Sequence, residues 1–470
     1  MGGHTRSYGV GDWDYYFVKL DPDQQVEWTR TVGGPGVDNC FAVRKSPDGG
    51  YLAAGHTNSF GMGNYDFYVV KLDADGEVLW TRTVGGPEGE FAFSMAVTED
   101  GGCAITGATH SFGMGNYDVY VVKLDPEGEL EWTRTIGGPA HDEGRSIWQT
   151  TDGGYVIAGK TASFGAGGDD LYVLKLDSQG EVQWTRTVGG SNADRGYGVQ
   201  QTEDGGYVVA GLTASYGAGG NDVYVVRLDP DGELLWTKTI GRLGQDEGMS
   251  VQQTSDLGFV IAGSTTSFSA GVRNIYTVKL DADGNLEWAR GTLHSAGVDF
   301  AFHVHQDETG GYVVGGYSQV QGPSDYDMYL MKLDANGEGC IWSAAGGTVS
   351  SGGVSGSGGM TDEGGEIGEG GTVDSGGTIT MLCSTTGIAD ASNDPGTAIS
   401  PKPASDRFII TGIQMATVTV CDVLGQRVAG MHDVHGPVEL NASSWPCGAY
   451  FVQLIEQDGR RSVHKVLVER

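Results

Sequence analysis

The chain has 470 residues, enough for two or three domains, and carries 61 acidic against 28 basic side chains, a formal net charge of −33. Such an acidic balance disfavours direct binding to nucleic acid or to an anionic membrane, because both are recognised through Lys and Arg clusters. It suits a protein that stays soluble outside the cell. The sequence contains no apolar run long enough for a transmembrane helix, and its six scattered cysteines favour neither a disulfide scaffold nor a zinc site.

Tryptophans recur along the chain at intervals of 52 residues, and only the last interval, of 54, differs. Within one repeat, runs rich in Val, Tyr and Thr at 184–188, 195–202, 207–215 and 222–229 alternate with Gly- and Asp-rich turns. Runs of this length and composition predict β-strands, and no apolar pattern of helical period competes with them. The periodic tryptophans are Trp28, Trp80, Trp132, Trp184, Trp236, Trp288 and Trp342.

Four antiparallel strands repeated at a fixed period predict a β-propeller, because one such sheet cannot hide both faces from water and a ring of sheets can. The predicted fold is therefore all-β, with a seven-bladed propeller at 1–346. Six complete blades are expected to start at the tryptophans from Trp28 to Trp288. The strand at Trp342 and the opening of the chain would together form an incomplete seventh blade. Each tryptophan is expected to lie between neighbouring blades.

The opening of the chain repeats a later part of it. Residues 3–21 align with 55–73 at an offset of 52, so Met1 falls within the third strand of a predicted blade. No basic stretch followed by an apolar one precedes this point, as a secretory signal would require. The sequence therefore predicts a start that lacks a signal peptide and part of a blade.

Composition changes after the last repeat. Residues 347–392 are rich in Gly, Ser and Glu and are predicted to form a flexible acidic linker. From 393 to 470 short β-type runs return, and alternation such as that at 417–420 indicates a sheet with one solvated face. A small Ig-like β-sandwich is the predicted fold of this last part.

Four blocks in the last domain resemble the type A C-terminal sorting domain of proteins exported by the type IX secretion system. The blocks are SPKPASD at 400–406, DVLGQRV at 422–428, LNASSWPCGAYFV at 440–452 and KVLV at 465–468. Lys402 departs from the Asn usual between the two prolines. The resemblance implies export across the outer membrane by the type IX machinery, removal of this domain, and release or surface anchoring. The motif residues are Pro401, Pro403, Asp422, Gly425, Arg427, Gly448, Tyr450 and Lys465.

The repeats resemble secreted bacterial propellers without a defined activity, and also the blade motif of quinoprotein-type propellers. In the latter a Leu-Asp segment leads through a Gly turn to a Trp that docks on the neighbouring blade. Here the segment recurs at 72–80 and 228–236, one residue shorter than usual. The motif is architectural and brings no catalytic residue with it.

Two sets of acidic residues recur once per repeat and would form two circles in a ring. They could bind Ca²⁺ or another divalent cation, which prefers clustered oxygen ligands, but Asp also accepts backbone N–H bonds in turns, and the sequence favours that reading. No cofactor is otherwise indicated. The first circle comprises Asp38, Glu90, Asp142, Asp194, Asp246 and Asp299, and the second Asp14, Asp66, Asp118, Asp170, Asp222 and Asp327, with Asn274 as the exception.

Symmetry is broken in the last repeat by His303, His305 and Asp307, which are two residues apart along one strand. Such a spacing places the three side chains on one face, where they could bind a divalent metal or could simply be solvated. Aromatic residues of the Ser-Phe/Tyr-Gly loop could stack on sugars, although their regular spacing also fits packing at the rim. These residues are Phe60, Phe112, Phe164, Tyr216 and Phe268.

Nucleophile elbows, Cys/His pairs and phosphate-binding loops are all missing from the sequence, so an enzyme is not favoured. The favoured function is a secreted or cell-surface binding module whose ligand is a polysaccharide or a protein. The alternatives are an extracellular hydrolase or lyase acting at the propeller funnel, and a structural adhesion or matrix protein. Neither nucleic acid nor membrane insertion is expected.

Overall fold

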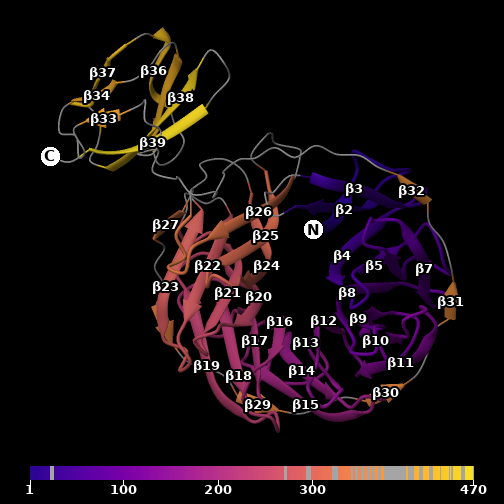
Figure 1. Ribbon diagram of the computed structural model, residues 1–470. Helices are drawn as coiled ribbons and strands as arrows, with labels where there is room; N and C mark the ends of the chain where they lie inside the picture. The colour runs from indigo at the N-terminus through magenta and orange to yellow at the C-terminus, as the bar shows by residue number, and fades with distance from the viewer. Residues whose placement is uncertain are drawn as a thin grey trace.

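Seven antiparallel sheets surround a central axis in the computed structural model (Figure 1). The described residues are 1–470 except 22–25, 269–272, 293–297, 320–326, 340–341, 345–347, 351–353, 357–359, 363–365, 369–371, 375–397, 401–406, 412–415, 423–426, 435, 444, 446–447, 457–460 and 469–470. No helix long and apolar enough to cross a membrane occurs in this part of the chain.

Five blades are built from four consecutive strands, ordered from the axis outward. One contains β4 (Asp38–Lys45), β5 (Tyr51–Thr57), β6 (Asp66–Leu72) and β7 (Val78–Gly85). The next contains β8 (Glu90–Val97), β9 (Cys103–Thr109), β10 (Asp118–Leu124) and β11 (Leu130–Gly137). It is followed by β12 (Asp142–Gln149), β13 (Tyr155–Thr161), β14 (Asp170–Leu176) and β15 (Val182–Gly189). Then come β16 (Asp194–Gln201), β17 (Tyr207–Thr213), β18 (Asp222–Leu228) and β19 (Leu234–Gly241). The fifth contains β20 (Asp246–Gln253), β21 (Phe259–Thr265), β22 (Asn274–Leu280) and β23 (Leu286–Thr292).

Two blades have three consecutive strands each. The first contains β1 (Gly2–Thr5), β2 (Asp14–Leu20) and β3 (Val26–Gly33), and the last β24 (Phe300–Gln306), β25 (Tyr312–Ser318) and β26 (Asp327–Leu333). Six further short strands pair with the outer strands of six blades. They are β27 (Trp342–Ala344), β28 (Thr348–Ser350), β29 (Val354–Gly356), β30 (Met360–Asp362), β31 (Glu366–Gly368) and β32 (Thr372–Asp374).

The predicted all-β fold with seven blades is confirmed, but the assignment of strands to blades differs from the prediction. The periodic tryptophans from Trp28 to Trp288 each lie on the outer strand of a blade, which pairs with the strand before it, as β7 does with β6. The predicted six complete blades and one incomplete blade are instead five four-stranded and two three-stranded blades. The period gives the number of residues in a repeat, but it does not show which strand of the repeat is the innermost of a blade. The assignment of strands to blades could therefore not be predicted from the sequence alone.

The strand at Trp342 also pairs differently from the prediction. We expected it to join the opening strands in a shared seventh blade, but β27 pairs with β23, while β1 pairs with β2 only. Between residues 347 and 392, where we predicted a flexible linker, the strands β28–β32 form regular pairs with outer strands. The predicted domain boundaries stay predictions.

The periodic tryptophans from Trp28 to Trp288 pack against the next blade, as expected. The ring of Trp184 lies against Gly232, in the hairpin turn of the following blade, where a Cβ would approach the ring within 3.0 Å. Two residues later, Arg186 lies over the same ring and donates to the carbonyl of Asp231 and to the carboxylate of Glu233 in that turn. The same contacts, of a tryptophan ring and of the basic residue two positions later with the next hairpin turn, recur between other neighbouring blades. Residues within each repeat therefore determine how neighbouring sheets stack.

Every complete inner strand contains a β-bulge that brings it very close to the next strand. In β16 the register with β17 shifts between Gly196 and Gly198, so that Tyr197 is the extra residue. Gly211 faces the bulge from β17, and a Cβ there would overlap the backbone carbonyl of Arg195. A glycine is needed because no side chain fits between the two backbones. The bulges set the course of the inner strands around the axis.

The C-terminal part forms two antiparallel sheets with a shared core. One contains β33 (Ala398–Ser400), β34 (Arg407–Thr411) and β37 (Val438–Asn441), and the other β36 (Arg427–Val434), β35 (Ala416–Asp422), β38 (Gly448–Glu456) and β39 (Arg461–Val468). Apolar side chains from both sheets meet, among them Ile410, Val420 and Val452, each fully buried. Apolar residues of the two sheets therefore close a two-layer β structure. That this layer structure is Ig-like stays a prediction.

Candidate functional site

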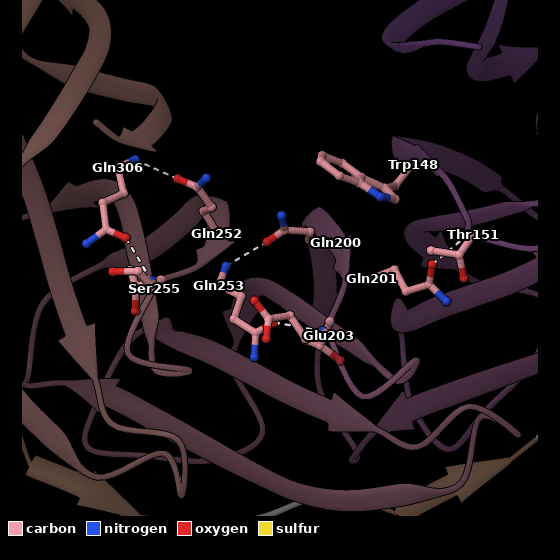
Figure 2. A pocket seen from close by; sticks show the side chains of 11 residues that line it. Trp148, Thr151, Gln200, Gln201, Glu203, Gln252, Gln253, Ser255 and Gln306 are labelled. Carbon is pink, nitrogen blue, oxygen red and sulfur yellow. Dashed lines mark hydrogen bonds between the residues drawn. The ribbon is translucent and has the colours of Figure 1, made fainter. Parts of the chain in front are cut away.

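A groove of about 450 Å³ lies where several inner strands end (Figure 2). Residues from consecutive blades line it, because each inner strand ends at the same side of the ring and is followed by a turn. Its lining consists of Trp148, Thr151, Gln200, Gln201, Thr202, Glu203, Gln252, Gln253, Thr254, Ser255 and Gln306. Amides and hydroxyls dominate, with one aromatic ring and one acidic side chain.

The last residue of four inner strands is a glutamine that bridges to the preceding blade, and three of these glutamines line the groove. The Oε1 atom of Gln201 accepts the backbone N–H of Thr151 at 2.8 Å, and that of Gln253 accepts the N–H of Glu203 at 2.9 Å. Gln306 accepts the N–H of Ser255 in the same way, at 2.8 Å. These bonds hold the floor of the groove in one arrangement, since each side chain is anchored to a neighbouring backbone.

A second row of glutamines lies one residue earlier. The Oε1 atom of Gln200 accepts the N–H of Gln253, and that of Gln252 accepts the N–H of Gln306, both at 2.6 Å. The amide nitrogen of Gln252 lies 3.3 Å from Nδ1 of His305. Among the described residues, none accepts a hydrogen bond from the amide nitrogen of Gln200, which is directed to the open side of the groove in Figure 2. Its oxygen is fixed, so this N–H₂ group is a pre-oriented donor.

Trp148 breaks the symmetry of the repeats at one wall of the groove. The equivalent positions in other blades hold Arg44, Ala96, Gln200 and Gln252. The indole is 43% exposed, although a side chain of this size is usually well buried. The sequence analysis did not single out Trp148 as a site residue. Its position outside the 52-residue series of tryptophans was the signal that could have found it.

Nearer the axis, the extra residues of the bulges contact one another across blades. The guanidinium of Arg145 lies 4.0 Å over the ring of Phe93, which in turn meets the edge of Phe41. Arg145 also forms an ion pair of 2.7 Å with Glu143. Burial alone would raise the pKa of Glu143, but His141, Arg145 and Lys160 lower it to about 2. This carboxylate is therefore held in its ionised form beside the Arg145 guanidinium.

The first circle of carboxylates is engaged within each blade. Asp142 is fully buried, accepts the hydroxyl hydrogens of Thr161 and Ser163 and, at 2.7 Å, the N–H of Gly138. Equivalent bonds are formed by the acidic residue at this position in other blades, including Glu90. These contacts are those of a turn-stabilising side chain.

The second circle is also buried, but it has fewer donors. Asp118 accepts the N–H of Met114 at 2.8 Å through Oδ2, whereas its Oδ1 has no partner among the described residues. Both Asp118 and Asp142 lie against Gly137, where a Cβ would overlap Oδ1 of Asp118. Burial raises the pKa of Asp118 to about 7, and the nearby Asp142 adds to the rise. Divalent cation binding at these circles stays a prediction.

His303, His305 and Asp307 do not come together as a group of metal ligands. The structure places the two histidines on β24 and Asp307 in the turn after it, where its carboxylate pairs with Lys332 at 2.8 Å. In the described parts of the chain, no three His, Cys, Asp or Glu side chains are grouped to hold a metal ion.

The periodic loop aromatics lie half-buried against the blade cores. The ring of Phe60 packs 5.7 Å from that of Tyr68, and Phe112 lies 5.8 Å from Tyr120. Tyr216 donates its hydroxyl hydrogen to the carbonyl of Gly189. Phe164 and Phe268 make equivalent ring contacts with Tyr172 and Tyr276. Such contacts account for their regular spacing, and their predicted contact with sugars stays a prediction.

A family profile described as outer membrane protein assembly factor BamB, PQQ_2, matches residues 65–358. The chain belongs to this family. A second profile, described as a β-propeller domain of unknown function, matches residues 46–78 of this chain. The profile of a secretion system C-terminal sorting domain matches residues 398–469. The predicted propeller and sorting domain are thereby confirmed, and the latter marks the chain as a secreted or cell-surface protein handled by the type IX machinery.

Individual proteins similar to this chain have low sequence identity to it. Regulatory protein FlaEY of Caulobacter vibrioides is 26% identical over 253 residues, which are 48% of this chain and 26% of that protein. The chain thus spans about a quarter of that relative. A Bacteroides caccae protein of unknown function is 13% identical, with a TM-score of 0.37 over 63% of this chain and 94% of the other. PorZ of Porphyromonas gingivalis, a surface component of the type IX secretion system, is 11% identical, with a TM-score of 0.34. The match covers 98% of this chain and 59% of PorZ.

The five motif residues of the sorting domain that the structure describes lie on the four strands of one sheet, β36, β35, β38 and β39. Asp422 ends β35 and is the register partner of Tyr450 in β38, whose side chain is buried in the core. Lys465 in β39 is opposite Phe451. Arg427 begins β36 and Gly448 begins β38. Pro401, Pro403 and Gly425 lie outside the described residues.

Proposed function

We propose that the protein is a secreted type IX cargo whose propeller binds a neutral polysaccharide in the groove beside Trp148. The observation that carries the proposal is one exposed indole placed next to rows of fixed amides, at the point where the repeats lose their symmetry. In a symmetric ring, a feature that only one blade has is not needed for the architecture and is available for a ligand.

An exposed indole suits a sugar ring because it offers a flat apolar face, and a side chain of this kind can bury on the order of 200 Å² in all, of which the exposed 43% is open to a ligand. The apolar C–H face of a pyranose can lie on it and exclude water. Trp148 loses little conformational entropy in doing so, since its ring has only two side-chain torsions. It therefore supplies contact area, while direction and specificity come from the polar groups nearby.

The polar lining matches the hydroxyls of a sugar. Each amide offers both a donor and an acceptor, and each Thr or Ser hydroxyl can act as either. The bonds of Gln200 and Gln252 to the following blade fix their side chains before a ligand arrives. Pre-oriented groups cost less entropy on binding, so even neutral hydrogen bonds contribute to affinity.

The charge of the protein selects among polysaccharides. The lining of the groove has Glu203 as its single charged side chain, and the chain as a whole carries −33. Uronic-acid and sulfated polymers would be repelled at long range and would find no cation in the groove. A hydrolase needs two carboxyl groups that flank the bond to be cleaved, and this lining provides one. The arrangement therefore supports binding of a neutral glycan over its hydrolysis.

Substitution of Trp148 by alanine in the full chain is expected to weaken binding of a neutral polysaccharide at least tenfold, which is about 1.4 kcal/mol. Because the indole is 43% exposed, the free energy of unfolding should change little. Affinity electrophoresis over neutral and uronic-acid polysaccharides identifies the ligand, and calorimetry with an oligomer of it measures the loss.

Two variants control this measurement. Trp148→Phe keeps a flat ring and should retain part of the affinity. Leu235→Ala removes another exposed apolar side chain, on the outer strand β19, and should bind as the unmodified protein does. Equal affinity of Trp148→Ala and Leu235→Ala would refute the groove as the binding site.

The export route makes a separate prediction. In a cell with a type IX secretion system, deletion of residues 393–470 is expected to prevent the protein from reaching the medium, because the sorting domain is its export signal. The Trp148→Ala variant should be exported normally, since the groove has no part in sorting. Immunodetection in medium and cell fractions measures both, and a deletion variant found in the medium would contradict the assignment.

A further inference from the structure

Six short strands line the outside of the ring in the reverse order of the blades. β27 pairs with β23, β28 with β19, β29 with β15, β30 with β11, β31 with β7 and β32 with β3, each antiparallel and over three residues (Figure 1). Every pairing is with the last residues of an outer strand, such as 239–241 or 83–85. The six described strands between Trp342 and Asp374 therefore pair with six blades in turn.

The sequence of this segment has a period of its own. Its strands begin at residues 342, 348, 354, 360, 366 and 372, six residues apart. Gly-Gly pairs follow at the same interval, at 346–347, 352–353, 358–359, 364–365, 370–371 and 376–377. Three paired residues and three connecting residues thus make one unit. This hexapeptide repeat is unrelated to the 52-residue repeat of the blades in length and composition.

The two periods match in space. Six extended residues reach about 20 Å. Packed sheets lie about 10 Å apart, and sheets that radiate from an axis diverge toward their outer edges. One hexapeptide is therefore long enough to leave one outer strand and reach the next.

The ring needs such a tie because its two end blades share no strand. The first blade contains only β1, β2 and β3 of the chain's opening, and the last only β24, β25 and β26. They meet through side-chain packing, as where Met328 lies 3.3 Å from the position that a Cβ on Gly3 would occupy. No hydrogen-bonded sheet crosses this seam within the described residues.

We propose that residues 342–374 form a belt that closes the propeller from outside, by adding a fifth or outermost strand to six of the seven blades. Opening of the seam then requires that the belt be stretched or peeled from the outer strands. The belt also covers edges that would otherwise expose unpaired N–H and C=O groups to other chains. Because it binds through main-chain hydrogen bonds, its period matters more than its side chains.

Two insertions after Gly359, in the full chain, test this assignment. Three added residues, Ser-Gly-Ser, shift the rest of the belt by half a unit and place glycine pairs opposite the outer strands. Six added residues, a second copy of TVSSGG, shift it by one whole unit and restore the match on the next blade. Amide hydrogen exchange of the outer strands, resolved by peptide, measures the pairing.

With three added residues, exchange is expected to accelerate at least tenfold at the ends of β11, β7 and β3. The ends of β15 and β19, whose belt strands precede the insertion, should stay protected and serve as the internal control. With six added residues all five should stay protected. Unchanged exchange in both variants, or equal loss in both, would overturn the belt. Protection found only in a dimer on size-exclusion chromatography would also overturn closure within one chain.

Discussion

Alanine at Gly211 is expected to destabilise the propeller by more than about 3 kcal/mol, the range reached when overpacking forces backbones apart. The added Cβ would overlap the backbone carbonyl oxygen of Arg195, an atom fixed by the bulge of β16. Neither strand can yield alone, because β17 is also paired with β18 on its other side. Urea unfolding followed by tryptophan fluorescence measures the change.

Gly168→Ala is the matched control for this substitution. A Cβ at Gly168 would meet no atom within 4 Å, so the free energy of unfolding should change by less than about 0.5 kcal/mol. If Gly211→Ala were as stable as Gly168→Ala, the close approach of β16 and β17 and with it the bulged inner strands would be wrong.

Replacement of Asp66 and Asp118 by asparagine is expected to stabilise the protein at pH 8 and to flatten its pH dependence. Burial raises the pKa of each residue to about 7, and the neighbouring Glu90 or Asp142 adds to the rise. An unfolded chain releases these protons near pH 4, whereas the folded protein keeps them until about pH 7. Stability therefore falls as the pH rises from 4 to 7. The loss is on the order of 2 kcal/mol for each residue.

The chain already contains one neutral member of this circle. Asn274 occupies this position in the blade of β20–β23, where it begins β22 and is buried. Asn274→Asp should therefore do the opposite, adding a loss of stability as the pH rises from 4 to 7 and leaving the protein less stable at pH 8. Thermal unfolding from pH 4.5 to 8.5 measures all the variants.

A divalent cation between the carboxylates would reverse these results. Asparagine at Asp66 and Asp118 would then lower stability at pH 8, and a chelator would lower that of the unmodified protein. Stabilisation by the substitutions, together with indifference to the chelator, is the result expected if protons neutralise the second circle.

The 52-residue period predicted the fold well because each repeat is a complete set of local instructions. Turn glycines, β-type runs and a docking tryptophan recur in each copy, so the number of blades and the contact of Trp184 with the next blade could be predicted. The phase of the sheets could not, because a period has no starting point. The pairing of β27 with β23 depends on which edge is free, which only the assembled ring shows.

The site was harder to predict because most of the residues that the sequence analysis selected recur from repeat to repeat. The candidate site depends instead on a residue that occurs in one repeat only. The loop aromatics such as Phe60 recur and pack, whereas Trp148 occurs once and is exposed. The amide row from Gln201 to Gln306 was visible only as repeated letters, since its bonds join strands of different blades. In the glycine-rich segment, composition indicated a flexible linker and concealed the six-residue spacing that matches the blades.

The most direct test of the account is an experimental structure of the full chain with an oligomer of the neutral polysaccharide that it binds most tightly. We expect density for a sugar ring stacked on the indole of Trp148 and within hydrogen-bonding distance of Gln200. Density on the rim, over Phe60 or Tyr216, with an empty groove would contradict the account.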